Sequence, residues 1–307
     1  MIVCCGEAVI DFLPRKSAEG LAVYQPFNGG SIFNTAIALA RLGNATGFFT
    51  GISTDFFGDS LIDGLKASRV DLKYTKVWDR PSTLAFVKLD NGHARYSFFD
   101  DNSASRMLEK KDLPKFAAKV RALHFGSISL IPDPGASTLE ALMKREAKTR
   151  VICLDPNIRP TIIKDRRSYV ARINRMIPLC DILKISDEDA AWLTGQKDIA
   201  KAAKKWLKAG AKIVAVTKGG DGVEAFTKRD SFALPSVPVK VADTVGAGDT
   251  FTAGLLTALS KAGLLDKKKL ATITGDDLKS ALQFAARAAA VTVSRPGANP
   301  PWAHELA

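Results

Sequence analysis

The stretch Ala242-Asp243-Thr244-Val245-Gly246-Ala247-Gly248-Asp249-Thr250-Phe251 joins an extended, proline-punctuated segment to a helix-forming segment that is rich in Ala, Leu and Thr. Small residues at 246–248 let successive backbone amides approach an anion. The start of a helix adds N–H groups without partners and the positive end of the helix dipole. The stretch therefore predicts an anion site at a helix N-terminus.

Asp249 is the unusual part of this predicted site, because it places a carboxylate beside an anion. There it can accept a proton from a hydroxyl nucleophile while the amides stabilise the charge that develops on a transferring phosphoryl group. The alternative is an Asp that only caps the helix. The local pattern leaves both interpretations open.

Most of the chain has the pattern of an α/β protein. Helical spacing is present in Ser31–Leu42 and in Asp276–Val293. From about residue 120, short apolar runs alternate with helix-length segments; the runs are Ala122–Phe125, Val151–Asp155, Asp181–Lys184 and Ile213–Thr217. Because parallel strands need crossover helices, this alternation predicts a mostly parallel sheet covered by helices.

An early part of the chain departs from this alternation. Strand-like runs occur at Ala22–Tyr24, Thr83–Leu89 and His93–Phe99, and Asn91-Gly92 between the last two is typical of a hairpin turn. We therefore expect two units. They are an α/β domain of residues 1–11, 31–73 and 100–307, and a small β-sheet lid of residues 12–30 and 74–99.

Composition excludes several classes of protein. The 307 residues are 46% hydrophobic and 25% charged, which is typical of a folded chain, and no apolar run approaches the roughly 18 residues of a membrane span. The start of the sequence lacks the pattern of a signal peptide. The four cysteines form no C-x-x-C pair, so reduced thiols and a cytoplasmic location are expected.

The net charge of +12 raises the alternative of a nucleic-acid-binding or regulatory protein. Its strongest feature is a helical face formed by Lys201, Lys204, Lys205 and Lys208. Because Trp206 and Leu207 point away from that face, the pattern favours a solvated surface over a core. The sequence has no G-x-x-x-x-G-K-[S/T] motif and no complete G-x-G-x-x-G after a strand, so neither a P-loop nor a dinucleotide site is expected.

Two motifs together resemble the signatures of the ribokinase-like (PfkB) carbohydrate kinases: Asn28-Gly29-Gly30 with Asn34, and Asp243–Phe251. The resemblance covers nearly the whole chain. It implies a three-layer α/β/α domain with a β-sheet lid and transfer of the γ-phosphoryl group of ATP to a sugar hydroxyl. By this resemblance Asp249 matches the catalytic base, and the amides of Gly246, Ala247 and Gly248 match the anion hole.

The resemblance also implies roles for other residues. The sugar would contact the lid residue Phe98 and a polar set formed by Asp11, Gly29, Gly30, Asn34 and Asp249. Arg159 would neutralise phosphate charge during transfer. The nucleotide would contact Lys184, Thr217, Lys218, Gly219, Gly222, Gly246, Gly248 and Ala286. Without the family, Gly29-Gly30 is an ordinary turn, Phe98 a packing residue and Arg159 an exposed ion-pairing residue.

The same resemblance also implies that metal ions bind. Ser186-Asp187-Glu188-Asp189 stands where the family usually has Asn-x-x-Glu, an element linked to magnesium and phosphate. Asp189 is therefore expected to order Mg²⁺ through water. Asp243 matches a position near a monovalent cation, for which K⁺ is the candidate.

Among sugars, D-fructose is the expected substrate, with fructose 6-phosphate as product. The segments Cys5–Phe12 and Tyr96–Arg106 look more like bacterial fructokinases than ribokinases. Relatives that act on 2-keto-3-deoxygluconate tend to have Arg where this chain has Asp100. Ribose, 2-keto-3-deoxygluconate and a catalytically inactive sugar sensor remain alternatives. Exposed lid edges favour a homodimer through the lid.

Overall fold

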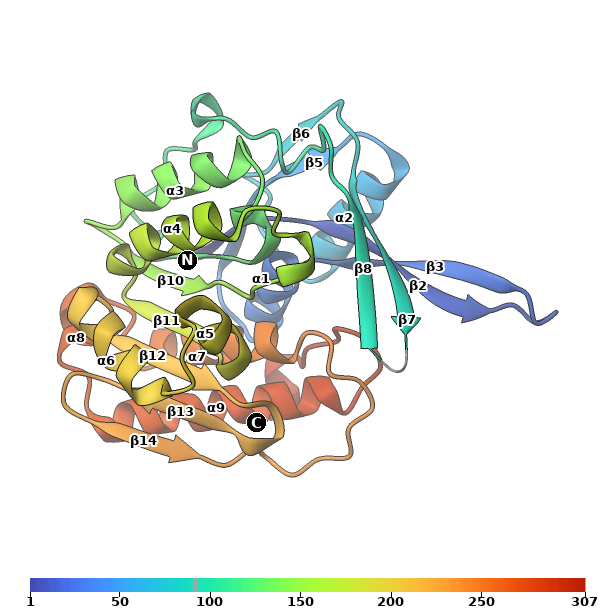
Figure 1. Cartoon of the computed structure of the whole chain (residues 1–307). Coiled ribbons are helices and arrows are strands. Elements are labelled where there is room, and N and C mark those ends of the chain that lie inside the picture. Colours follow the sequence, from blue (N-terminus) through green and yellow to red (C-terminus); the bar gives the residue numbers. More distant parts are fainter. Residues whose placement is uncertain (91–92, 307) are drawn as a thin grey trace.

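The structure, a computed structural model, describes residues 1–90 and 93–306 (Figure 1). The expected turn at Asn91-Gly92 lies outside the described residues. The strands are β1 Ile2–Cys5, β2 Val9–Lys16, β3 Ala22–Gly29, β4 Thr46–Phe49, β5 Gly51–Ser53, β6 Lys76–Trp78, β7 Thr83–Asp90, β8 His93–Phe99, β9 Ala122–Gly126, β10 Val151–Asp155, β11 Ile182–Ser186, β12 Ile213–Thr217, β13 Val223–Phe226 and β14 Ser231–Leu234. The helices are α1 Ser31–Arg41, α2 Phe56–Ala67, α3 Gly135–Glu146, α4 Arg166–Met176, α5 Asp187–Thr194, α6 Ile199–Ala209, α7 Ala247–Lys261, α8 Lys267–Ala271 and α9 Gly275–Val293. None of these helices is long and apolar enough to cross a membrane.

The central sheet has eight strands in the order β14-β13-β12-β11-β10-β9-β1-β4. All neighbours from β4 to β12 pair in parallel, and β13 and β14 pair antiparallel at one edge. Every residue of β1, β4, β9 and β10 is buried, as expected for strands covered on both faces. The predicted mostly parallel sheet is confirmed.

Helices cover both faces of this sheet (Figure 1). One apolar core lies under α1, α2, α7, α8 and α9, and a second lies under α3, α4, α5 and α6. Trp206 and Leu207 on α6 are buried, whereas the neighbouring lysines of that helix are exposed. The molecule therefore has the predicted three-layer α/β/α architecture.

A separate four-stranded sheet, in the order β3-β2-β7-β8, forms the lid. Its β2–β3 hairpin extends far from the body of the molecule (Figure 1). Two boundaries differ from the expected ranges. The lid sheet begins at Val9, because β2 follows β1 after a short turn, and Lys76–Trp78 pairs with Gly51–Ser53 in a two-stranded sheet of its own.

The order of the strands in the central sheet indicates where a ligand site is expected. β1 lies between β4 and β9, so the chain moves from β1 to one side and later returns to the other. Open α/β sheets bind ligands at the carboxyl ends of the strands next to such a reversal. Since β2 begins just after β1 ends, the lid extends from that same edge.

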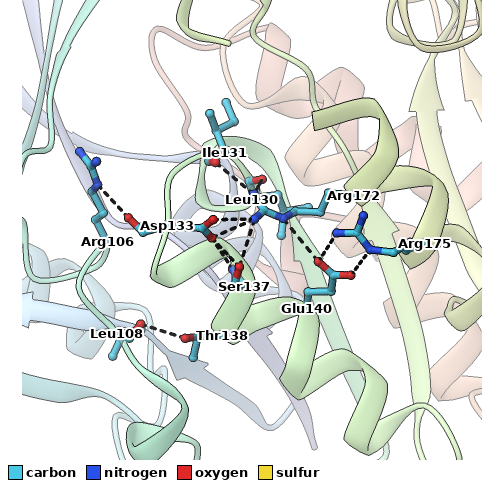
Figure 2. A network of polar contacts seen from close by, with 10 residues as sticks. All are labelled: Arg106, Leu108, Leu130, Ile131, Asp133, Ser137, Thr138, Glu140, Arg172 and Arg175. Carbon is cyan, nitrogen blue, oxygen red and sulfur yellow. Dashed lines mark hydrogen bonds and ion pairs between the residues drawn. The ribbon is translucent and has the colours of Figure 1, made fainter. Parts of the chain in front are cut away.

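A network of polar contacts fixes the segment that follows β9 (Figure 2). Arg172 on α4 donates to the carbonyl oxygens of Leu130 and Ile131 and to the Asp133 carboxylate at 2.8 Å. Arg106, on the segment that leaves the lid, donates to the Asp133 carbonyl at 3.3 Å. The network therefore ties the edge of the sheet to α4 and to the exit from the lid.

Candidate active site

A cleft of about 930 Å³ opens at the carboxyl ends of β1, β9, β10, β11 and β12. Gly29 and Asp243 do not line it. The other predicted site residues do: Asp11, Gly30, Asn34, Phe98, Arg159, Lys184, Asp189, Thr217, Lys218, Gly219, Gly222, Gly246, Ala247, Gly248, Asp249 and Ala286. The fold thus brings together residues from both ends of the chain.

The sequence predicts an anion site at the loop before α7. Gly246 has a φ of 77°, and a Cβ at this position would lie 2.8 Å from the Ala298 Cβ, so only glycine fits. α7 begins at Ala247, which places the Gly248 amide in the first turn, where N–H groups have no partner within the helix. The Ala247 amide differs from the expectation because it donates to the Thr244 carbonyl at 3.3 Å.

Asp249 lies in the same first turn and is buried. Its Oδ1 accepts a hydrogen bond from Ser31 Oγ at 2.5 Å, and its Oδ2 accepts one from Asn34 Nδ2 at 3.0 Å. Burial raises the pKa of this carboxyl, and the two hydrogen bonds and the Lys184 ammonium oppose the rise. The carboxylate therefore faces donors that favour its ionised form, as a proton acceptor requires.

Lys184 and Asp155 form a buried ion pair behind the anion site, with 2.8 Å between Nζ and Oδ2. Burial lowers the pKa of Lys184, but the adjacent Asp155 carboxylate outweighs this effect, so that the pKa is raised and the ammonium stays charged. A Cβ at Gly248 would lie 2.8 Å from Lys184 Nζ. A fixed cation thus sits directly against the anion site and adds to the helix dipole.

Asp11, Tyr96 and Phe98 form the lid side of the cleft. Burial raises the pKa of Asp11 to about 6, and the charge of Arg159 opposes this shift. Gly29 gives Asp11 its space, because a Cβ at Gly29 would lie 2.1 Å from Asp11 Oδ2. The rings of Tyr96 and Phe98 stack with their centroids 5.9 Å apart. A carboxylate beside aromatic rings suits a polyol, whose hydroxyls donate hydrogen bonds and whose C–H groups pack on the rings.

The opposite side of the cleft combines a glycine-rich loop with an apolar wall. The loop is Thr217–Gly222, which follows β12, and its Lys218 forms an ion pair with Glu224 at 2.7 Å. The apolar wall is formed by Val237, Val239, Val241, Ala286, Ala289, Ala290 and Val293. Such a surface suits the flat ring of a nucleobase, with the loop backbone near its sugar.

Arg159 lies on the loop after β10, and Asp189 lies in the first turn of α5, which directly follows β11. Arg159 donates to Asn157 Oδ1 at 2.6 Å, and Asp189 Oδ2 accepts from the Ile158 amide at 3.1 Å. Burial raises the pKa of Asp189 to about 6. These two side chains therefore bring one cation and one carboxyl to the middle of the cleft, between its two sides.

Asp243 lies outside the cleft, at the base of the loop that leads to α7. Its Oδ1 accepts from the Val245 amide at 3.0 Å, and its Oδ2 accepts from the Gly297 amide at 2.9 Å. The carboxylate thus joins the loop before α7 to the segment after α9.

The sequence profile described as "pfkB family carbohydrate kinase" matches residues 1–305. The chain belongs to this family. It is 52% identical to a fructokinase of Rhizobium leguminosarum bv. trifolii over 280 residues, which cover 91% of this chain and 86% of that protein.

Solved structures agree with this assignment. A fructokinase from Xylella fastidiosa with bound ATP has a TM-score of 0.90 at 28% identity, covering 99% of this chain and 96% of that one. A double mutant of a fructokinase from Vibrio cholerae O395, with fructose, ADP and a potassium ion bound, has a TM-score of 0.85 at 26% identity, covering 97% and 93%. The ribokinase-like fold expected from the sequence is therefore confirmed.

Three residues of this carbohydrate kinase cleft were not identified by motif: Glu7, Ser31 and Tyr96. Glu7 is buried, and its carboxylate accepts from the amides of Ile32 and Ser129 at 3.2 and 3.3 Å. It thereby joins the start of α1 to the segment after β9. The sequence does contain a sign of this role, because Glu7 is an acidic residue inside the apolar run at the start of the chain.

Asp100, the position where relatives that act on 2-keto-3-deoxygluconate tend to have Arg, lies beside Arg106. Its carboxylate pairs with Arg106 at 3.2 Å, and it is not among the described residues that line the kinase cleft.

Proposed function

We propose that this carbohydrate kinase transfers the γ-phosphoryl group of ATP to the 6-hydroxyl of D-fructose, forming fructose 6-phosphate. The position of Asp249 carries the proposal, because this buried carboxylate lies between the polyol side of the cleft and the anion site. The choice of fructose is supported by the names of the relatives, including the Vibrio cholerae enzyme with fructose bound.

In the proposed mechanism, Asp249 accepts the proton of the attacking sugar hydroxyl. The sugar oxygen then bonds to the γ-phosphorus as the bond to the ADP oxygen breaks. Negative charge on the transferring group is stabilised by the Gly248 amide, the N-terminus of α7 and the Lys184 ammonium. Arg159 turns from Asn157 to the phosphates and neutralises further charge.

We infer that Mg²⁺ accompanies ATP. The described residues hold no cluster of three His, Cys, Asp or Glu side chains that would bind a metal alone, so the phosphates and water would supply most ligands. Asp155 Oδ1, at the end of β10, is buried without a hydrogen-bond partner among the described residues, and Asp189 lines the cleft from the first turn of α5. Both carboxylates fit water molecules around the ion, which when bound neutralises phosphate charge.

Asp243 is the proposed anchor of a monovalent cation, K⁺, beside the anion site. Its carboxylate already ties the loop before α7 to Gly297, and backbone carbonyls of residues 291–297 would complete the ligands. The potassium ion bound to the Vibrio cholerae enzyme supports this assignment. A cytoplasmic location is supported by the four buried cysteines, all of which are free thiols.

We also infer that two copies pair through their lids. On the lid face opposite Asp11, Phe12 stacks on Phe86 at 4.5 Å, and Tyr24 and Phe99 pack edge-on against Phe86. Tyr24 is 48% and Phe99 60% exposed. An exposed aromatic cluster on a sheet that projects from the body suits a second copy of the same surface.

The substrate is tested with the purified protein, ATP, Mg²⁺ and a panel of D-fructose, D-ribose and 2-keto-3-deoxygluconate in a coupled assay for ADP. We expect the highest kcat/KM with fructose. Faster turnover of another sugar would replace fructose as the substrate. Binding of fructose and ATP without any release of ADP would instead identify a sugar sensor.

The role of Asp249 is tested separately with Asp249→Asn. We expect kcat to fall at least about 100-fold, because the amide cannot accept the proton. The Kd of ATP, measured by calorimetry, should stay within about threefold, because Lys184 and the α7 amides remain in place. Near-normal turnover by this variant would refute the assignment of the base.

A further inference from the structure

Two side chains of α1 hold the carboxylate of Asp249, one on each oxygen. Ser31 is the first residue of α1 and donates to Oδ1 at 2.5 Å, while Asn34, one turn later, donates to Oδ2 at 3.0 Å. Gly30 caps the helix without a side chain, so the Ser31 hydroxyl is not used as a helix cap. Rotation of the carboxylate about its Cβ–Cγ bond would break both hydrogen bonds.

This clamp affects the geometry of proton transfer. A carboxylate has about four lone-pair sites, and the clamp uses one on each oxygen while fixing the plane of the others. Proton transfer needs an acceptor held at hydrogen-bond distance from the hydroxyl in a defined direction. Asn34 and Ser31 both line the cleft, but Asn34 is also a predicted sugar contact, so its two roles cannot be separated by mutation. The Ser31 hydroxyl has Asp249 as its partner.

We propose that Ser31 is a positioning residue for phosphoryl transfer, whose hydroxyl fixes the orientation of the Asp249 carboxylate that accepts the proton. The inference rests on the proposed function, because it assumes that Asp249 is the base. It extends that function to a residue that directly follows the Gly29-Gly30 motif but matches no position of the signature.

The charges around Asp249 determine how loss of Ser31 would act. Lys184 on β11 favours the ionised carboxylate, whereas Asp155 on β10 and Asp11 on β2 disfavour it. Lys184 is shared with Asp155 through their ion pair, so its charge does not serve Asp249 alone. Among the described residues, removing the Ser31 hydroxyl therefore leaves Asn34 as the one side-chain donor to the carboxylate, and the pKa of Asp249 should rise further.

The central test compares Ser31→Ala with the wild type. We expect kcat to fall about tenfold while the KM of the sugar stays within about twofold, because orientation is lost but the sugar contacts remain. Because the base must be unprotonated, the acidic limb of the kcat/KM profile should move to higher pH by about one unit. Ser31→Thr, which keeps the hydroxyl, should retain about half of the wild-type kcat.

A matched control is Thr35→Val on the same helix. It removes a buried hydroxyl that donates to the Ser31 carbonyl and makes no contact with Asp249. This variant should keep the wild-type pH profile. An unchanged profile and kcat in Ser31→Ala, or a KM effect without a kcat effect, would overturn the proposal, because Ser31 would then be only structural or would bind the sugar directly.

A second readout does not depend on activity. The free protein is labelled with ¹³C at Asp carboxyl carbons, and the signal of Asp249 is identified by its loss in Asp249→Asn. Its titration should move to higher pH in Ser31→Ala and should match the wild type in Thr35→Val. If no sugar were phosphorylated, the proposed function would fail, while this titration would still show whether Ser31 stabilises the ionised carboxylate; an unmoved titration refutes the Ser31 proposal by itself.

Discussion

We predict that Asp11 couples sugar binding to pH. Burial raises its pKa to about 6, while binding of sugar hydroxyls requires the ionised carboxylate as an acceptor. Above pH 6 the group is ionised and ready to bind; below pH 6 it is protonated and must release a proton first. We therefore expect the Kd of fructose to increase as the pH falls, by about tenfold for each unit below 6. Calorimetric titrations of fructose without ATP, from pH 5 to pH 8, measure this dependence.

Asp11→Asn is the control for this titration, because it has nearly the same shape and cannot ionise. It should bind fructose weakly and with little dependence on pH. A wild-type Kd that is constant over the same range would contradict the role given to Asp11, whose pKa is raised to about 6 and whose carboxylate is the proposed acceptor for the sugar.

The residues that sequence reasoning missed have roles that depend on contacts between distant parts of the chain. The local context of Asp249, small residues followed by a helix, predicted either a base or a helix cap, and only the family resemblance favoured the base. The role of Ser31 depends on a contact between residues 218 positions apart, and that of Glu7 on contacts with α1 and with the segment after β9. Such partners are set by how the elements pack, and no spacing along the chain contains them.

Secondary structure could be predicted from the sequence better than these contacts. The helix expected at Ser31–Leu42 spans Ser31–Arg41, because its apolar period and its glycine end are local properties. The helix expected from Asp249 begins two residues earlier, at Ala247, because the left-handed Gly246 is the residue that ends the preceding loop. The pairing of β6 with β5, outside the lid, was not predictable, since three-residue strands carry almost no pattern.

At the scale of paired strands, Gly29→Ala tests the fit between β2 and β3. The added Cβ would meet Asp11 Oδ2 at 2.1 Å, so the Asp11 carboxylate has to leave its position. We expect the KM of fructose to rise at least about tenfold, while the KM of ATP stays unchanged, because the lid does not form the nucleotide side. Steady-state kinetics with each substrate varied in turn measure this difference.

Gly275→Ala, at the start of α9, is the matched control. Its added Cβ would find its nearest neighbour at 3.7 Å, an ordinary contact, and the position lies outside the cleft. Both kinetic constants should stay at the wild-type values in this variant. Equal effects of Gly29→Ala on the two substrates would show that the change disturbs the whole fold rather than the position of Asp11.

In the whole molecule, the excess of basic residues is confined to the later part of the chain. Residues 1–100, which include the lid strands, carry ten basic and ten acidic residues, so the surplus of +12 belongs entirely to residues 101–307. That later part provides Lys184, the loop after β12 and the helix start at the anion site. This distribution agrees with the proposed ligands, a neutral sugar at the lid and a nucleotide polyphosphate at the later part of the chain.

The lid determines the expected assembly. If the aromatic face of the lid pairs with a second copy, light scattering should give twice the 33.0 kDa mass of the chain. The double variant Tyr24→Asp/Phe99→Asp should be monomeric, because it places two charges in the proposed interface, and it should keep its fold because both side chains are already largely exposed. Val77→Asp, an exposed position on β6 outside the lid sheet, should remain dimeric. A monomeric wild type at micromolar concentration would exclude pairing through the lid.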